Sequence, residues 1–91
     1  MIKSFKHKDL RGLFLTGHSS KVAPALQKRI LRRLDSLDLA EETKDLDIPG
    51  FNFHGLMGNP KRYSIHVNGP WCLTFEWHEK NIYAVDMEQY H

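Results

Sequence analysis

The spacing of hydrophobic residues changes along the 91-residue chain, from a helical period in the first half to strict alternation in the second. A short alternating run at 2–5 predicts a first strand. Apolar residues three and four positions apart predict a helix over about 9–15, and a longer one from about 24 to 39, where proline suits the first turn. The apolar stripe of the longer helix consists of Leu26, Ile30, Leu34 and Leu37.

In the second half, apolar and polar residues alternate over 63–67 and 71–77, which predicts two strands. The Asn68-Gly69-Pro70 segment between them is typical of a hairpin turn. The segment at 51–54, ending at Gly55 or Gly58, and the apolar run at 82–85 predict two further strands. The sequence thus changes from helices to strands near residue 50.

The resulting order, β-α-α-β-β-β, predicts an α+β fold in which the helices pack on one face of a mostly antiparallel sheet. A chain of 91 residues has room for one hydrophobic core, so we expect a single domain over 1–91. The opposite face of the sheet is expected to be polar and open, and to carry any catalytic site. Its expected side chains are those of His54, Ser64, His66, Asn68, Cys72, Thr74 and Glu76.

Composition narrows the class of protein. The chain is 41% hydrophobic and 26% charged, which is typical of a globular protein rather than a disordered one. A single cysteine excludes an internal disulfide and a cysteine-based metal knuckle, and favours a reducing cytoplasm. No apolar run is long enough to cross a membrane, and the first residues lack the features of an export signal. Six histidines lack the close spacing of metal ligands, so we predict no metal site.

The positive charge is uneven, although the net charge is only +2. One group lies on the longer helix, opposite its apolar stripe: Lys28, Arg29, Arg32 and Arg33. Such a group is most often a solvated helix face, and the alternative is contact with nucleic-acid phosphates. A second group, Lys61-Arg62-Tyr63, combines two cations with an aromatic ring beside a strand. It has the residues to hold a phosphate and stack a base, although chance explains it equally well.

Candidate chemistry gathers at His54 and at the end of the chain. Tyr90 and His91 lie in the last five residues, which follow the apolar run at 82–85, so a phenol, an imidazole and a carboxylate are expected at a sheet edge. His54 is interpreted as a hydrogen-bonded structural residue or as a catalyst, and Gly55 beside it leaves room for a ligand. Cys72 is interpreted as an inert small side chain more readily than as a nucleophile.

Several separated motifs resemble one family. The chain opens with Met1-Ile2-Lys3-Ser4-Phe5-Lys6-His7-Lys8, contains His54-Gly55-Leu56-Met57-Gly58, and ends with Glu88-Gln89-Tyr90-His91. Between them lie Arg33-Leu34-Asp35-Ser36-Leu37-Asp38 and Tyr63-Ser64-Ile65-His66-Val67-Asn68-Gly69-Pro70-Trp71. The order and the overall length resemble the HigB toxins, also called plasmid-maintenance killer proteins, of the RelE superfamily.

This resemblance implies a microbial-RNase fold and a ribosome-dependent mRNA endonuclease that inhibits translation, without a metal ion or cofactor. It also implies a helix-turn-helix antitoxin that neutralises the toxin, and a complex that represses its own operon, so that operator DNA is contacted only through the antitoxin. By the same resemblance, His54 matches the active-site histidine, and Tyr90 and His91 match the C-terminal catalytic pair.

The sequence departs from the family pattern at three positions. Cys72 stands where an arginine is usual, Met57 replaces a lysine of some members, and Gln89 replaces an acidic residue. The arginine matters most, because a fixed guanidinium stabilises the charge that develops on a phosphate. Lys61 or Arg62 is expected to compensate. Three functions remain open: an mRNA-cleaving toxin, a non-catalytic module that binds the antitoxin, and a single-stranded RNA binder that acts through Lys61-Arg62-Tyr63.

Overall fold

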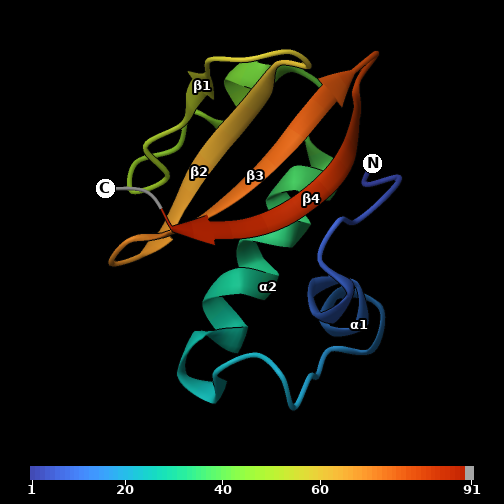
Figure 1. Ribbon diagram of the computed structural model, residues 1–91, viewed down its shortest axis with the longest axis vertical. Helices are drawn as coiled ribbons and strands as arrows, with labels where there is room; N and C mark the ends of the chain where they lie inside the picture. Colours follow the sequence, from blue (N-terminus) through green and yellow to red (C-terminus); the bar gives the residue numbers. More distant parts are fainter. Residues whose placement is uncertain (90–91) are drawn as a thin grey trace.

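The computed structural model describes residues 1–89, which form two helices followed by a four-stranded antiparallel sheet in the order β1-β2-β3-β4 (Figure 1). The elements are α1 (Lys8–Thr16), α2 (Pro24–Leu39), a 3-10 helix (Thr43–Leu46), β1 (His54–Leu56), β2 (Arg62–Asn68), β3 (Trp71–His78) and β4 (Asn81–Gln89). Both helices lie on the same side of the sheet (Figure 1). The predicted α+β class and the one-sided packing are therefore confirmed.

The predicted first strand at 2–5 is wrong. This segment runs beside β4 but forms only two isolated parallel bridges, Ile2 with Ile82 and Phe5 with Val85. Between them, the Ser4 hydroxyl oxygen accepts a hydrogen bond from the Ala84 amide at 2.8 Å and the Ser4 carbonyl accepts one from the Val85 amide at 3.2 Å, so the backbone pairing is irregular rather than a continuous ladder. Ala84 has a left-handed φ of 52°, which interrupts the regular edge that a paired strand would need. The order of elements is α-α-β-β-β-β.

Both predicted helices are present. His7 caps α1, because its Nδ1 accepts the Leu10 amide at 3.3 Å. The left-handed Gly17, with a φ of 80°, ends the helix. In α2, Pro24 occupies the first turn as expected, and its apolar stripe faces the core. Among the described residues 1–89, no helix is long and apolar enough to cross a membrane.

The strands are confirmed for β2, β3 and β4, and the hairpin between β2 and β3 turns at Gly69 and Pro70. The strand predicted at 51–54 is wrong in its bounds, since β1 begins only at His54. Asn52 has a left-handed φ of 46°, which ends any extended run there. Phe51 is instead buried in the core.

The core lies between the helices and the sheet. Leucine and isoleucine side chains of α1 and α2 pack against alternate residues of the strands, so the apolar face of the sheet is covered. Its fully buried large side chains are Leu10, Leu13, Ile30, Leu34, Leu37, Leu46, Ile65, Val67, Leu73, Phe75, Ile82 and Val85. This packing leaves the other face of the sheet for polar side chains.

Candidate active face of the sheet

The polar face is defined by the register of the four strands. His54 lies opposite Ser64, and Ser64 lies opposite Thr74, so their side chains share one face of the sheet. On β4, Asp86 pairs with Thr74, and Glu88 pairs with Cys72. We use "polar face" for His54, Arg62, Ser64, His66, Cys72, Thr74, Glu76, Asp86 and Glu88. It contains six of the seven side chains that the alternation predicted.

The prediction that this face is open is wrong at its centre. Ser64, Cys72 and Thr74 are buried, whereas His54 is exposed at the rim. Thr74 is enclosed because Arg62 and Glu88 both hydrogen-bond its hydroxyl group from the neighbouring strands. Asn68 was also expected here, but its side-chain oxygen accepts a bond from Arg29 of α2, beyond a register shift in β2.

His54 is held in one tautomer by the backbone. Its Nδ1 lies 2.8 Å from the carbonyl oxygen of Asn52, and a carbonyl can only accept, so Nδ1 carries the proton. In the neutral ring, Nε2 then has a lone pair and can take a proton from a substrate. The left-handed conformation of Asn52 turns that carbonyl toward the ring. The sequence pattern gave no indication of this role for Asn52, although asparagine tolerates this conformation well.

The space beside Gly55 is filled by the protein itself. A Cβ atom added at Gly55 would lie 2.9 Å from Cε and 3.1 Å from Nζ of Lys61, so the lysine side chain crosses β1 at this point. The expectation that Gly55 leaves room for a ligand stays a prediction, because the atoms that lie over it are the end of an exposed, flexible lysine side chain. The glycine admits Lys61, whose ammonium group lies 5.5 Å from the centre of the Tyr63 ring.

Arg62 joins three strands on the polar face. Its Nη2 donates to the Thr74 hydroxyl at 3.1 Å and to the Ala84 carbonyl at 2.8 Å, while Nη1 lies 3.3 Å from Glu76. Thr74 in turn donates to Glu88 of β4. These contacts use three of the five N–H donors of the guanidinium. A cation is thus fixed on the polar face, bonded directly to the carboxylate of Glu76 and linked through Thr74 to that of Glu88.

The structure does not bring Lys61, Arg62 and Tyr63 together. Alternation along β2 sends Arg62 to the polar face and Tyr63 to the opposite one. There the Tyr63 ring stacks between Phe53 and Phe75, at centroid distances of 5.6 and 6.0 Å. Tyr63 is packed as part of the core wall, with Lys61 over it. Of the three, Arg62 alone lies with His54.

Glu76 also bonds a second histidine, His78, for which the sequence pattern indicated no role. The Nε2 atom of His78 lies 3.2 Å from Glu76 Oε1, and Tyr83 packs edge-on against the imidazole ring. Because 74, 76 and 78 alternate along β3, their shared face was visible in the sequence. The pairing of Glu76 with Arg62 was not visible in the sequence, because it depends on the register between strands.

Ser64 is the other unexpected feature of the polar face. Its residue is fully buried, and its hydroxyl has no hydrogen-bond partner among residues 1–89. It lies between His54 and Thr74 in the register. Cys72, the position of the expected arginine, is also buried and lies between His66 and Glu88.

The basic group on α2 divides into two pairs. Arg33 donates to the His66 carbonyl at 2.6 Å and lies over the Phe51 ring, and Arg29 donates to the Val67 carbonyl at 3.3 Å. Burial, and then the charge of Arg29, lower the pKa of Arg33. Lys28 and Arg32 are exposed. Arg29 and Arg33 thus contact the sheet, although Arg29, like Lys28 and Arg32, is exposed.

Tyr90 and His91 lie outside the described residues. The last residue of β4, Gln89, pairs with Trp71 beside the β2–β3 hairpin. The two predicted catalytic residues therefore follow a strand whose preceding side chains, Asp86 and Glu88, belong to the polar face.

Comparison with known proteins identifies the family. Residues 3–91 match the model for the RelE-like toxin HigB of type II toxin–antitoxin systems. The chain belongs to the HigB-like toxin family. It is 39% identical to the endoribonuclease HigB of Proteus vulgaris over 92 residues, which span all of both chains. It is 35% identical to the toxin HigB-1 of Vibrio cholerae over 80 residues, which cover 85% of this chain and 84% of that one.

Membership in the HigB-like family confirms the resemblance drawn from the motifs. A type II toxin acts with a cognate antitoxin, so a protein partner is part of the family's biology. The polar face is the part of this HigB-like fold where an imidazole, a guanidinium and carboxylates are assembled.

Proposed function

We propose that this chain is an endoribonuclease that cleaves mRNA on the ribosome, without a metal ion or cofactor, and so inhibits translation. The observation that carries the proposal is His54, an exposed imidazole whose Nδ1 is bonded to a backbone carbonyl. Its Nε2 can therefore act as a base. The name of the Proteus vulgaris relative, endoribonuclease HigB, supports the same reaction.

The reaction requires a base, a cation and an acid. The base removes the proton of a ribose 2′-OH, whose oxygen attacks the adjacent phosphorus, and the bond from phosphorus to the 5′-oxygen breaks. An acid protonates that departing oxygen, which leaves a 2′,3′-cyclic phosphate and a 5′-hydroxyl. We propose that His54 and His91 share the acid and base roles, and that Tyr90 positions or stacks on the substrate. His54 in the tautomer described above suits the base.

Arg62 is proposed as the cation that stabilises charge on the phosphate. It shares the polar face with His54, and its bonds to Thr74, Glu76 and Ala84 hold it in place before substrate binds. Lys61 and Tyr63 lie on the other side of β2, where the Tyr63 ring is packed between Phe53 and Phe75, so we propose that the exposed Lys61, supported by Tyr63, contacts RNA that passes over the edge of β1. We thus assign to Arg62 the phosphate-stabilising role of the arginine that is usual at the position of Cys72.

The exposed cations of α2 are proposed to contact ribosomal RNA. Lys28 and Arg32 face solvent, while Arg29 and Arg33 hold the end of β2 beside the same helix. Contacts with phosphates would supply affinity without sequence preference. The antitoxin is proposed to be a helix-turn-helix protein through which the complex binds operator DNA.

A second function, a non-catalytic module that binds the antitoxin, is favoured by two observations. Cys72 is an uncharged buried residue where an arginine is usual, and Glu76 neutralises part of the charge of Arg62. In that case the fold is retained for antitoxin binding and operon control.

Expression of the chain without antitoxin separates the two functions. The proposed nuclease arrests growth and translation, and His54→Ala relieves the arrest while His18→Ala, in an exposed loop, does not. Normal growth with abundant folded protein favours the second function instead. Cys72→Arg then adds a test, because a restored cation should produce arrest where the wild type produces none.

A further inference from the structure

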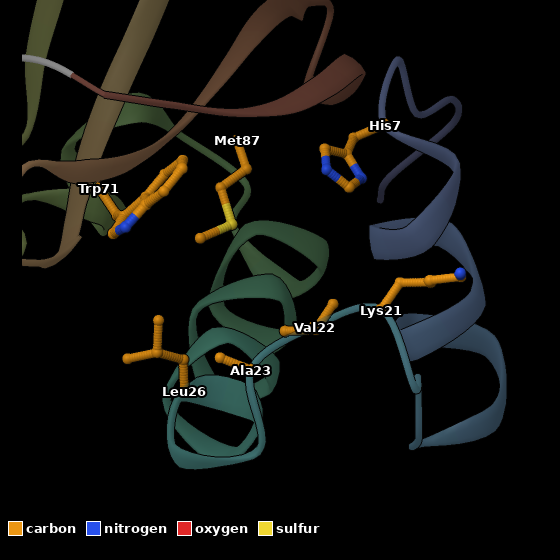
Figure 2. A pocket seen from close by; sticks show the side chains of 7 residues that line it. All are labelled: His7, Lys21, Val22, Ala23, Leu26, Trp71 and Met87. Atoms are coloured by element: carbon orange, nitrogen blue, oxygen red, sulfur yellow. The ribbon is translucent and has the colours of Figure 1, made fainter.

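A pocket of about 200 Å³ lies on the helix side of the molecule, away from the polar face. It is bounded by the start of α1, the segment that leads into α2, and the ends of β3 and β4. Its seven lining residues are His7, Lys21, Val22, Ala23, Leu26, Trp71 and Met87 (Figure 2). Met87 points to this side because its neighbour Glu88 points to the polar face.

The walls of the pocket are mainly apolar, with one polar group directed inward. Figure 2 shows Trp71, Met87 and Leu26 around the space, with the His7 ring facing Met87. Because His7 Nδ1 accepts the Leu10 amide, Nε2 carries the proton of the neutral ring and is a hydrogen-bond donor. An occupant with a large apolar side chain and a nearby acceptor oxygen would satisfy both features.

The charge at the rim selects an acidic occupant. Lys21 lines the pocket, and none of the seven lining residues is acidic. A lysine beside an apolar depression complements a segment in which a carboxylate accompanies the apolar side chain. The volume suits a single large side chain rather than a whole helix.

We propose that this pocket receives an apolar side chain from an acidic segment of the cognate antitoxin. The proposal depends on the toxin–antitoxin part of the proposed function and not on mRNA cleavage. It places the antitoxin contact on the opposite side of the sheet from His54. Trp71 and Met87 are the apolar anchors, and Lys21 and His7 pair with the carboxylate.

The pocket can be filled without disturbing the core. Ala23 lines it, is exposed, and makes no side-chain cap bond at the start of α2, so Ala23→Arg places bulk in the opening. Ala25→Arg is the matched control, an exposed alanine two residues further along that does not line the pocket. Lys21→Glu reverses the charge at the rim, with Lys80→Glu in an exposed turn as its control.

The test is calorimetric titration of each variant with the antitoxin encoded beside this chain's gene, after circular dichroism and thermal unfolding show a native fold. Ala23→Arg should weaken binding about tenfold or more, and Lys21→Glu should weaken it several-fold, most strongly at low salt, while both controls bind as the wild type does. Unchanged affinity of Ala23→Arg and Lys21→Glu overturns the proposal, as does a wild-type chain that does not bind.

Two further outcomes keep the proposals separate. If the Ala23→Arg variant no longer binds ribosomes but still binds the antitoxin, the pocket is a binding site for RNA or the ribosome, and the proposal fails. Antitoxin binding is measured without RNA, so a chain that cleaves no mRNA still tests the pocket. If Ala23→Arg still cleaves mRNA but is no longer neutralised, both the pocket and the nuclease are supported.

Discussion

At the scale of single residues, the chemistry of His54 depends on a neighbour that has no reactive group of its own. The carbonyl of Asn52 fixes the proton on Nδ1, and it reaches the ring because Asn52 adopts a left-handed φ of 46°. A histidine that is free to change tautomer would present the correct nitrogen for only part of the time. The orientation of the proposed base is therefore a property of the backbone.

This dependence predicts opposite results for two substitutions of Asn52. Asn52→Gly keeps the left-handed conformation at no steric cost, so cleavage should remain close to that of the wild type. Asn52→Val opposes this conformation, at a cost of about 1–3 kcal/mol, and should lower both the cleavage rate and the melting temperature. Equal activity of the two variants would contradict the role given to the carbonyl.

The sequence alone identified His54 but not how it is held. Its motif and its place beside a predicted strand were sufficient to select the residue, whereas its hydrogen bond depends on one dihedral angle that no periodicity reveals. Arg62 shows a different limit. The alternation predicted for β2 already separates Arg62 from Tyr63, whereas its bonds to Thr74, Glu76 and Ala84 depend on the register between strands.

Among the strands, β4 is the one that leads to the proposed catalytic pair at 90–91. A backbone irregularity at Ala84 determines the direction of this strand. The register between β3 and β4 shifts at this point, and Ala84 has a left-handed φ of 52°. The Ser4 hydroxyl oxygen accepts a hydrogen bond from the Ala84 amide, and Arg62 donates one to the Ala84 carbonyl. Both backbone groups that the irregularity removes from the β3–β4 pairing are therefore satisfied. The N-terminal segment and β2 thus hold the strand that leads to the C-terminus.

Ala84→Gly should raise the free energy of unfolding by about 1 kcal/mol, because glycine adopts this conformation without the steric cost that alanine incurs. Arg62→Met should lower it by about 2 kcal/mol through the loss of charged hydrogen bonds. Urea denaturation of both variants checks these values. A destabilised Ala84→Gly variant would show that the left-handed conformation is not the native one.

The double variant measures the coupling between the two positions. If Arg62 holds the irregularity, glycine at 84 should recover part of the stability lost with Arg62→Met beyond simple addition. Strict additivity would mean that Arg62 acts only through Thr74 and Glu76. The alternation of residues predicted β2 and β3 well, but it could not predict this irregularity, because alanine gives no local signal for a left-handed conformation.

At the scale of the whole molecule, three surfaces are separated by the sheet and by α2. The polar face carries the proposed nuclease, the helix side carries the pocket, and α2 carries the exposed cations Lys28 and Arg32. The fold class and the one-sided arrangement followed from the order of helices and strands. The burial of the centre of the polar face could not be predicted from that order, because it depends on contacts that Arg62 and Glu88 make across strands.

The division of the basic group predicts different effects for its members. Lys28→Glu with Arg32→Glu should weaken ribosome binding and reduce its salt dependence while stability changes little, since both side chains are exposed. Arg33→Glu should mainly destabilise the fold, because the guanidinium is bonded to the His66 carbonyl and packed on Phe51. Sedimentation with ribosomes at several salt concentrations, beside thermal unfolding, measures both. Ribosome binding that is unchanged by the exposed pair would refute their assignment.

The most direct test of the account is cleavage of mRNA on purified ribosomes by the isolated chain, in buffer with and without EDTA. The wild type and His18→Ala should cut the message equally in both buffers, with 2′,3′-cyclic phosphate ends, and His54→Ala should be slower by about 10²-fold or more. An intact message with the wild type on active ribosomes, or undiminished cleavage by His54→Ala, would contradict the claim that His54 acts as a catalytic residue on the polar face.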